Sequence, residues 1–315
     1  MTASSSTSPG TGSRRPSGLA WRRARWGYVF IAPWILGFFL FTLIPMIATF
    51  IFTFTNIDLA NAGNIQFVGL ENYAQLLTDK QTHASLLVTF KFALIALPVA
   101  MLLPFGVAIL VNSRHLRGTS AFRVLFFLPY VVPFVAGVLI WQEMLSESGW
   151  INDFLRAIGI QHPPDWLQDP TWIYPGLVIM GVWGIGAGII VYLAGLQGVP
   201  TELYDAANID GAGWWGSLRH ITMPMLSPVF LYTLILGIVE VLQYFLVPLV
   251  LKNGTGEPGG STLFFNLYLY KTFFTFQNMA YGATLAWLLF GITLLITLVI
   301  FRLSRRWVYY AGDLK

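Results

Sequence analysis

The sequence contains no cysteine, and only 10% of its 315 residues are charged. The absence of cysteine excludes disulfides, thiolate nucleophiles, iron–sulfur clusters and cysteine-bound zinc. A soluble globular domain has about 25% charged residues, so this chain has too few charges to cover the surface of a soluble protein. Hydrophobic residues make up 56% of the chain and the mean hydropathy is +0.66, which indicates a protein whose outer surface faces lipid.

Further absences narrow the possible functions. The phosphate-binding loop of many ATPases ends in Gly-Lys-Ser or Gly-Lys-Thr, whereas none of the five lysines here follows a glycine, so we expect no ATP hydrolysis by this chain. Its four histidines are scattered and lack the i, i+4 spacing of a metalloprotease helix. We therefore expect no metal site and no catalytic residues. The net charge of +4 comes from loops and termini, so it does not indicate nucleic-acid binding.

Long intervals without a charged residue divide the chain. A helix needs about 20 mainly apolar residues to cross a bilayer. Five intervals contain 19 to 32 uncharged residues, and a sixth is interrupted only by Glu240. We therefore predict an all-α integral membrane protein with six transmembrane helices, at residues 28–54, 86–111, 121–144, 172–196, 229–251 and 280–301.

Basic residues indicate how these helices are oriented, because they favour the cytoplasmic side of a membrane. With six spans, 13 of the 18 Lys and Arg residues fall on the side that holds both termini, so we expect both termini to be cytoplasmic. Residues 1–27 are rich in Ser, Thr, Pro and Gly and are expected to form a disordered tail. Residues 28–315 then form one transmembrane domain. The first apolar run is about twice as long as the core of a signal peptide, which argues against cleavage.

One cytoplasmic connection, residues 197–227, is long and polar. Pro200 suits the start of a helix, and Glu202 and Asp205 suit the positive end of its dipole. Gly211 suits the left-handed residue that follows the end of a helix. We predict a short helix of about ten residues here, stopped by glycine and starting directly after a membrane span.

The same loop contains a recognisable spacing. It reads Asp205-Ala206-Ala207, three residues, Gly211, nine residues, Ile221, one residue, Met223-Pro224. This resembles the E-A-A-x(3)-G-x(9)-I-x-L-P signature of the membrane subunits of bacterial ABC importers, with Asp in place of Glu and Met in place of Leu. Three further segments are similar to the sugar-permease branch, which includes maltose-type and glycerol-phosphate-type systems: residues 126–129, 193–197 and 254–262.

The resemblance implies a type I ABC importer permease whose loop forms a coupling helix that docks on a separate ATPase subunit. The interface residues are then Asp205, Ala206, Ala207, Gly211, Ile221 and Pro224. Implied partners are two cytoplasmic ATPase subunits that bind ATP and Mg²⁺, a second homologous permease subunit in a heterodimer or a copy of this chain, and an extracytoplasmic solute-binding protein. The implied activity is ATP-driven import of a sugar or related polyol across the bacterial cytoplasmic membrane by alternating access.

Glu240 lies near the middle of the fifth span. An ionisable side chain at that depth is costly unless it faces a wet cavity or a polar partner. Gln243 and Tyr244 follow at i+3 and i+4 and would share its helix face. We expect these three residues to line the substrate pathway and to hydrogen-bond a hydroxyl-rich solute. A helix contact satisfied by a neighbour, or an interface with a partner subunit, would also explain Glu240.

Two features leave alternatives open. Gly181, Gly184 and Gly188 form a stripe of small residues in the fourth span, which favours close helix packing over substrate contact. The segment 145–171 on the external side contains Trp150 and several acids. It fits contact with a solute-binding protein and an interfacial loop anchored by tryptophan equally well.

The main alternative function is an ion-coupled secondary transporter that uses Glu240 as its coupling group. That class predicts inverted repeats of broken helices, which the sequence does not show. It also leaves the loop from Asp205 to Pro224 unexplained, so we favour the ABC importer.

Overall fold

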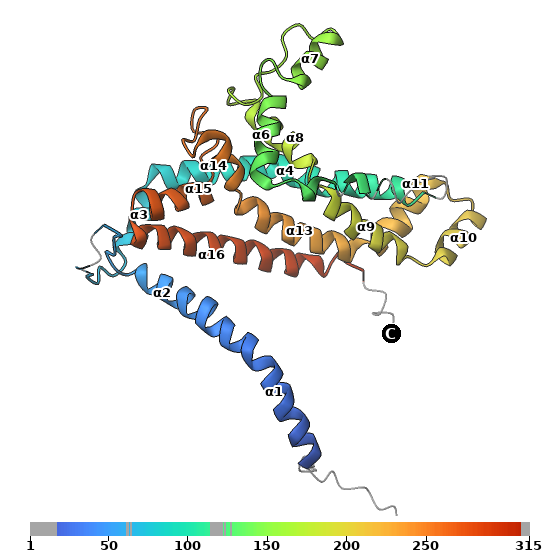
Figure 1. The fold of residues 1–315 in the computed structure, drawn as a ribbon. Helices are drawn as coiled ribbons and strands as arrows, with labels where there is room; N and C mark the ends of the chain where they lie inside the picture. Colours follow the sequence, from blue (N-terminus) through green and yellow to red (C-terminus); the bar gives the residue numbers. More distant parts are fainter. Residues whose placement is uncertain are drawn as a thin grey trace, which may run out of the picture. The chain divides into compact units, whose positions relative to one another are not determined.

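The computed structural model describes residues 18–60, 63, 65–113, 122, 124–126 and 128–309, and within these the regular elements are helices (Figure 1). The chain divides into two units, residues 1–52 and 53–315. An all-helical fold agrees with the prediction made from the charge-free intervals.

The first unit is one helical segment. It consists of α1 (Gly18–Phe38), the π-helical turn η1 (Phe39–Leu43) and α2 (Ile44–Phe52). Its stretch Arg25–Phe52 is long and apolar enough to cross a membrane, which matches the predicted first span. Residues 18–27, predicted as part of the tail, belong to α1 because Leu, Ala and Arg favour helix. Residues 1–17 of that tail lie outside the described residues.

The second unit opens with α3 (Glu71–Thr78) and the 32-residue helix α4 (Lys80–Val111). Helix α4 starts six residues before the predicted span 86–111. Asp79 caps it, because its carboxylate accepts a hydrogen bond from the Gln81 backbone N–H at 2.9 Å. Such a cap satisfies a donor that the first turn leaves unpaired, so the helix extends beyond the apolar stretch.

The third predicted span, 121–144, is interrupted in the structure. A 3₁₀ turn, η2 (Leu128–Val131), precedes α6 (Phe134–Met144), which has only 11 residues. Pro129 lies within the turn and Pro133 directly before α6. Proline removes a backbone donor and clashes with the preceding turn of a helix, which is why hydropathy alone overestimates the length of this helix.

The fourth predicted span is bent. Its two halves, α8 (Ile173–Val182) and α9 (Gly186–Gln197), meet at 58° across a short break. Between α6 and α8 the chain forms α7 (Trp150–Ala157), which lies at the tip of a lobe that projects from the helical body (Figure 1).

The last two predicted spans correspond to Ser227–Lys252 and Met279–Ser304. The first comprises α13 (Ser227–Leu242) and α14 (Leu246–Lys252), and the second is α16. The remaining elements are α10 (Thr201–Ile209), α11 (Trp214–Ser217), η3 (Leu218–Thr222), α12 (Met223–Met225), α15 (Phe265–Tyr270) and η4 (Lys271–Thr275). The described part of the chain thus holds four helices long enough to cross a membrane, or five if the bent pair is one span.

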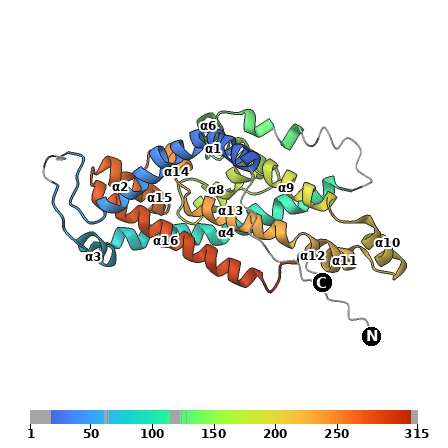
Figure 2. The same ribbon diagram turned by 90° about the horizontal axis from the view of Figure 1, so that it is seen from below.

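Helix α4 is the centre of the packing. It contacts α8, α9, α13 and α15, and Figures 1 and 2 show α4, α13 and α16 running side by side. Glycines allow the close approach: a Cβ atom on Gly237 of α13 would lie 2.7 Å from the Leu97 side chain of α4. A Cβ atom on Gly188 of α9 would lie 3.1 Å from Pro104 of α4. The packing role predicted for the glycine stripe is therefore confirmed at Gly188.

Candidate functional site

The loop between α9 and α13 forms the predicted short helix, α10. Pro200 precedes it, Glu202 lies in its first turn and Gly211 ends it with φ +80°. The Ala212 N–H donates to the Ala207 carbonyl at 2.8 Å, and the Gly211 N–H donates to the Asn208 carbonyl at 3.1 Å. This pair of bonds is a Schellman motif, which requires a left-handed residue after the helix. The glycine-stopped helix predicted from the sequence is therefore confirmed.

Helix α10 has no buried residue, so it is a projecting element (Figure 1). Asp205 and Ala206 are exposed and Ala207 is half-buried. The helix is attached to the rest of the loop through Tyr204, whose hydroxyl lies 3.0 Å from the Thr222 hydroxyl. Tyr204 is the one side chain of α10 for which the described residues show a hydrogen bond to another element, so the small side chain of Ala206 is left at the surface.

Ile221 and Pro224 lie in the second half of the loop and are half-buried. Ile221 packs against the buried cluster that contains Leu226. The Pro224 carbonyl accepts a hydrogen bond from the Ser227 hydroxyl at 2.6 Å, and that hydroxyl accepts one from the Tyr309 N–H at 2.8 Å. Ile221 therefore packs inward and the Pro224 carbonyl is tied to the start of α13, whereas Asp205 and Ala206 are at the surface.

A cavity of about 660 Å³ lies beside Glu240. Glu240 and Tyr244 both line it, together with residues from α6, the α8–α9 bend and α14. A smaller cavity of about 150 Å³ is also lined by Glu240 and Tyr244. No hydrogen bond from another described residue reaches the Glu240 carboxylate. Among the described residues, therefore, the structure does not place a neighbour that satisfies this side chain.

Gln243 does not line either cavity. Helix α13 ends at Leu242, and Gln243 is its C-cap. The Gln243 carbonyl accepts a hydrogen bond from the Asn266 side chain at 2.8 Å. The i+3 argument assumes a continuous helix, and the break after Leu242 removes that assumption at Gln243, while Tyr244 still reaches the cavity.

Aromatic side chains form much of the cavity wall. The rings of Trp141 and Trp183 meet edge to face, with centroids 6.2 Å apart. Tyr244 stacks on Phe92 at a centroid distance of 4.9 Å, which fixes its ring. The two tryptophans are 42 residues apart in sequence, and Trp183 lies in the break between α8 and α9, so reasoning from the sequence missed their contact.

Two of the three stripe glycines also lie at this cavity. Gly181 and Gly184 line it, and a Cβ atom on Gly181 would meet nothing within 4 Å. Their predicted role in helix packing is therefore not what the structure shows, because the bend after α8 turns this part of the helix towards open space. The sequence does contain a signal for this cavity, because two glycines lie close to Trp183 and carry no side chain that would fill it.

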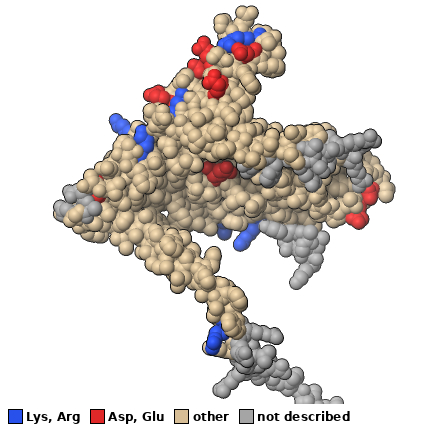
Figure 3. All heavy atoms as spheres, viewed as in Figure 1, with Lys and Arg blue, Asp and Glu red and all other residues tan. Residues whose placement is uncertain are grey.

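Charge is distributed unevenly over the molecule. On the face drawn in Figure 3, acidic and basic side chains gather on the lobe that carries α7 and at the ends of the helical body, and one acidic patch interrupts the uncharged middle. Between Arg219 and Lys252 the sequence has a single charged residue, Glu240. An isolated charge within an apolar span is costly unless it faces a cavity or a polar partner, and Glu240 lines a cavity.

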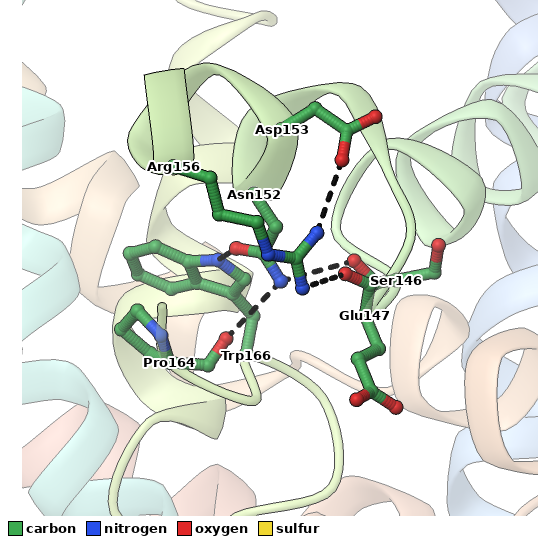
Figure 4. Close-up of polar contacts among 7 residues, drawn as sticks. All are labelled: Ser146, Glu147, Asn152, Asp153, Arg156, Pro164 and Trp166. Atoms are coloured by element: carbon green, nitrogen blue, oxygen red, sulfur yellow. Dashed lines mark hydrogen bonds and ion pairs between the residues drawn. The ribbon is translucent and has the colours of Figure 1, made fainter. Parts of the chain in front are cut away.

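The lobe of residues 145–171 is held by the polar contacts drawn in Figure 4. Asn152, which is 1% exposed, donates to the carbonyls of Ser146 and Pro164 and accepts from the Trp166 ring N–H at 2.7 Å. Trp166 is thus an internal residue. In contrast, Trp150 is 79% exposed, so it is available to a lipid surface or to a partner protein, the two alternatives predicted for this segment.

A second polar cluster surrounds Asp79 and was missed by sequence reasoning. Its carboxylate accepts hydrogen bonds from the hydroxyls of Thr82 at 2.6 Å, Tyr268 at 2.7 Å and Tyr281 at 2.8 Å. Burial raises the pKa of Asp79, but these bonds and the one from the Gln81 backbone outweigh it and hold the pKa below its ordinary value of 3.8. The cluster joins the start of α4 to α15 and α16.

Comparison with known proteins identifies the family. The sequence profile of the binding-protein-dependent transport system inner membrane components matches residues 84–309. The chain belongs to this family. A probable ABC transporter permease protein, YesP, of Bacillus subtilis is 34% identical over 286 residues, which cover 90% of this chain and 92% of that protein.

Two other relatives of the permease carry the names of sugars. The lactose transport system permease protein LacF of Rhizobium radiobacter is 33% identical and covers 84% of this chain and 88% of its own length. The trehalose/maltose transport system permease protein MalF of Thermococcus litoralis is 31% identical and covers 92% of this chain and 97% of its own length. A solved bacterial alginate ABC transporter in complex with its alginate-bound periplasmic protein has the same fold, with a TM-score of 0.79 at 23% identity, covering 90% of this chain and 96% of that one.

Family membership settles the broad class of the protein. It is the permease of a binding-protein-dependent ABC importer, a multi-pass component of the inner membrane. The permease is not an enzyme, since the ATPase of such a transporter is a separate chain. The ABC importer is therefore supported over an ion-coupled secondary transporter.

Proposed function

We propose that this permease carries a sugar or related polyol across the cytoplasmic membrane by ATP-driven alternating access. The names of its relatives support this, since they include lactose, trehalose/maltose and arabinooligosaccharide permeases. The cavity beside Glu240 supports it independently, because a cavity of about 660 Å³ lies within the range of about 300–1,000 Å³ typical of small-molecule sites.

The proposed assembly contains this chain, a second homologous permease subunit, two cytoplasmic ATPase subunits that bind ATP and Mg²⁺, and an extracytoplasmic solute-binding protein. Within it we propose six spans and two cytoplasmic termini, with residues 121–144 as the third span despite the breaks at Pro129 and Pro133. Residues 28–315 form the transmembrane domain, and residues 197–227 the coupling loop.

The observation that carries the proposal is the exposed helix α10 with its glycine stop. Asp205, Ala206 and Ala207 are proposed to contact an ATPase subunit, because small side chains on a projecting helix allow a close approach. Gly211 sets where the helix ends, and Ile221 and Pro224 direct the chain back into α13. Movement of the docked ATPase then displaces α10 and the helices connected to it.

The proposed solute pathway passes the cavity beside Glu240 and Tyr244. The Glu240 carboxylate accepts hydrogen bonds, and sugar hydroxyls supply donors. Gln243 lies outside the cavity lining, so the pathway rests on the other two residues.

Reconstitution tests the proposal. The complete transporter, placed in proteoliposomes with its solute-binding protein, is expected to accumulate a labelled sugar from a panel that includes maltose, lactose and an arabinooligosaccharide. Uptake should require ATP at the ATPase side and persist when ion gradients are dissipated. Uptake driven by an ion gradient without ATP would contradict the proposal. ATP-driven uptake of another class of solute, with no uptake of any sugar, would also contradict it.

A further inference from the structure

The cavity beside Glu240 combines aromatic walls with one negative charge. Trp141, Trp183 and Tyr244 line it, and Glu240 is the one charged residue among the described residues that do so. A site that recognises an acidic ligand uses Lys or Arg to pair with it. The described lining of this cavity contains no Lys or Arg and one Glu, so its charge is negative.

The aromatic walls suit a pyranose ring. Sugar rings have an apolar face of C–H groups, which packs on the flat face of an aromatic side chain, while their hydroxyls stay at the edge. Tyr244 is fixed by stacking on Phe92, and Trp141 and Trp183 brace each other edge to face. Rings that are already held lose little conformational freedom when a ligand packs on them.

The Glu240 carboxylate determines which charge on a sugar the cavity accepts. Glu240 is exposed to the cavity and receives no hydrogen bond from another described residue, so its lone pairs are open to ligand hydroxyls. An amino group on a sugar would add an attractive charge, and the tryptophan rings would favour that cation as well. A sugar carboxylate would be repelled, because two like charges close together in a cavity with apolar walls interact more strongly than they do in bulk water.

We propose that this cavity admits uncharged and amino-bearing sugars and excludes sugar acids, with Glu240 as the selecting group and Trp141, Trp183 and Tyr244 as packing surfaces. The inference rests on the proposed sugar transport and adds the sign of charge that the pathway accepts. It also separates this chain from the alginate transporter, which shares its fold and imports an acidic polysaccharide.

Binding measurements on the complete transporter in nanodiscs test this selection. The probes are three trisaccharides of similar size: maltotriose, which is neutral, a glucosamine trisaccharide, which is cationic, and trigalacturonate, which is anionic. We expect the wild-type complex to bind the neutral and cationic probes at least about tenfold more tightly than the anionic probe. Equal binding of all three probes would overturn the charge selection and leave sugar transport standing.

Variants assign the selection to its residue. Glu240→Gln should raise the affinity for trigalacturonate at least about tenfold and lower that for the cationic probe. Glu240→Asp keeps the charge and should keep the preference for neutral and cationic probes. This variant shows whether a substitution at this position disrupts folding. Glu143→Gln removes a similar charge from α6 outside the cavity lining and serves as the matched control. A preference unchanged in Glu240→Gln, or lost equally in Glu143→Gln, would overturn the proposal.

A third variant separates this inference from the function on which it rests. Trp183→Ala should weaken binding of the neutral and anionic probes by a similar factor, because it removes a packing surface and no charge. It should weaken binding of the cationic probe by at least as much, because it also removes a ring that attracts a cation. If the wild-type complex binds none of the three probes and imports a solute of another class, sugar transport and charge selection are both wrong.

Discussion

Two acidic residues show how this apolar chain uses its few charges. Asp79 is surrounded by hydrogen-bond donors from α4, α15 and α16. Glu240 faces a cavity and receives no hydrogen bond from the described residues. A carboxylate satisfied inside the protein stabilises the fold, whereas one left open to a cavity is available to a ligand.

Replacing Asp79 by Ala should destabilise the protein by about 1–3 kcal/mol, because the buried hydroxyls lose a shared charged acceptor. Thermal unfolding of the purified protein in detergent measures the change. Asp153→Ala is the matched control, since Asp153 makes only an exposed ion pair with Arg156 at 3.0 Å, and such pairs contribute little. An equal loss of stability in both variants would argue against a structural role for the Asp79 cluster.

Asp79 should also make the stability depend on pH. Its folded-state pKa lies below the ordinary value of 3.8, so the unfolded state takes up a proton first as the pH falls. The stabilisation is therefore complete above about pH 4 and is lost as the pH falls through the lower folded-state pKa. The difference in unfolding temperature between wild type and Asp79→Asn should shrink between pH 6 and pH 3. A difference that stays constant over that range would contradict the assignment.

The helices marked by a capping residue or a long charge-free interval could be predicted from the sequence. The breaks and bends within the predicted spans could not. Helix α10 has proline before it and glycine after it, and α16 lies in a long charge-free interval, so both follow from the sequence. The 58° bend between α8 and α9 lies in the break of residues 183–185, which contains Gly184, and a glycine permits a bend without requiring one. The wall that Trp183 shares with Trp141 involves that break, and the Asp79 cluster joins residues about 200 positions apart, so neither could be predicted from local pattern.

The end of α10 provides a test at this scale. Gly211 has φ +80°, and a β-branched residue held there costs about 1–3 kcal/mol. Gly211→Val should leave the permease in the membrane and reduce ATP-driven uptake at least about tenfold, because the helix presented to the ATPase ends differently. Uptake and co-purification of the ATPase subunits measure this effect.

Gly213→Val is the control for that variant. Gly213 has φ −74° and ψ 176°, a conformation open to any residue, and a Cβ atom there meets nothing within 4 Å. It should transport at close to the wild-type rate. Wild-type uptake in Gly211→Val would contradict the role of α10 in coupling.

For the whole molecule, the proposed orientation places α7 on the outer side of the membrane and α10 in the cytoplasm. The chain has no cysteine, so a single introduced cysteine can be labelled without background. Asp153→Cys on α7 should react with a membrane-impermeant maleimide when the outer face of the inner membrane is accessible. Asn208→Cys on α10 should react only after that membrane is permeabilised. The reverse pattern would contradict the proposed orientation.

The geometry of α9 links the two regions that this orientation places far apart. The helix begins at the bend beside Trp183 and ends three residues before Pro200. Its 12 residues span about 18 Å at about 1.5 Å per residue. In the proposed coupling it would act as a lever arm: a tilt of about 5° at the α10 end would displace the other end by about 1.5 Å. A shift of that size is enough to open or close an aromatic contact, so we expect small movements of α10 to reach the cavity wall without any unfolding of the helix.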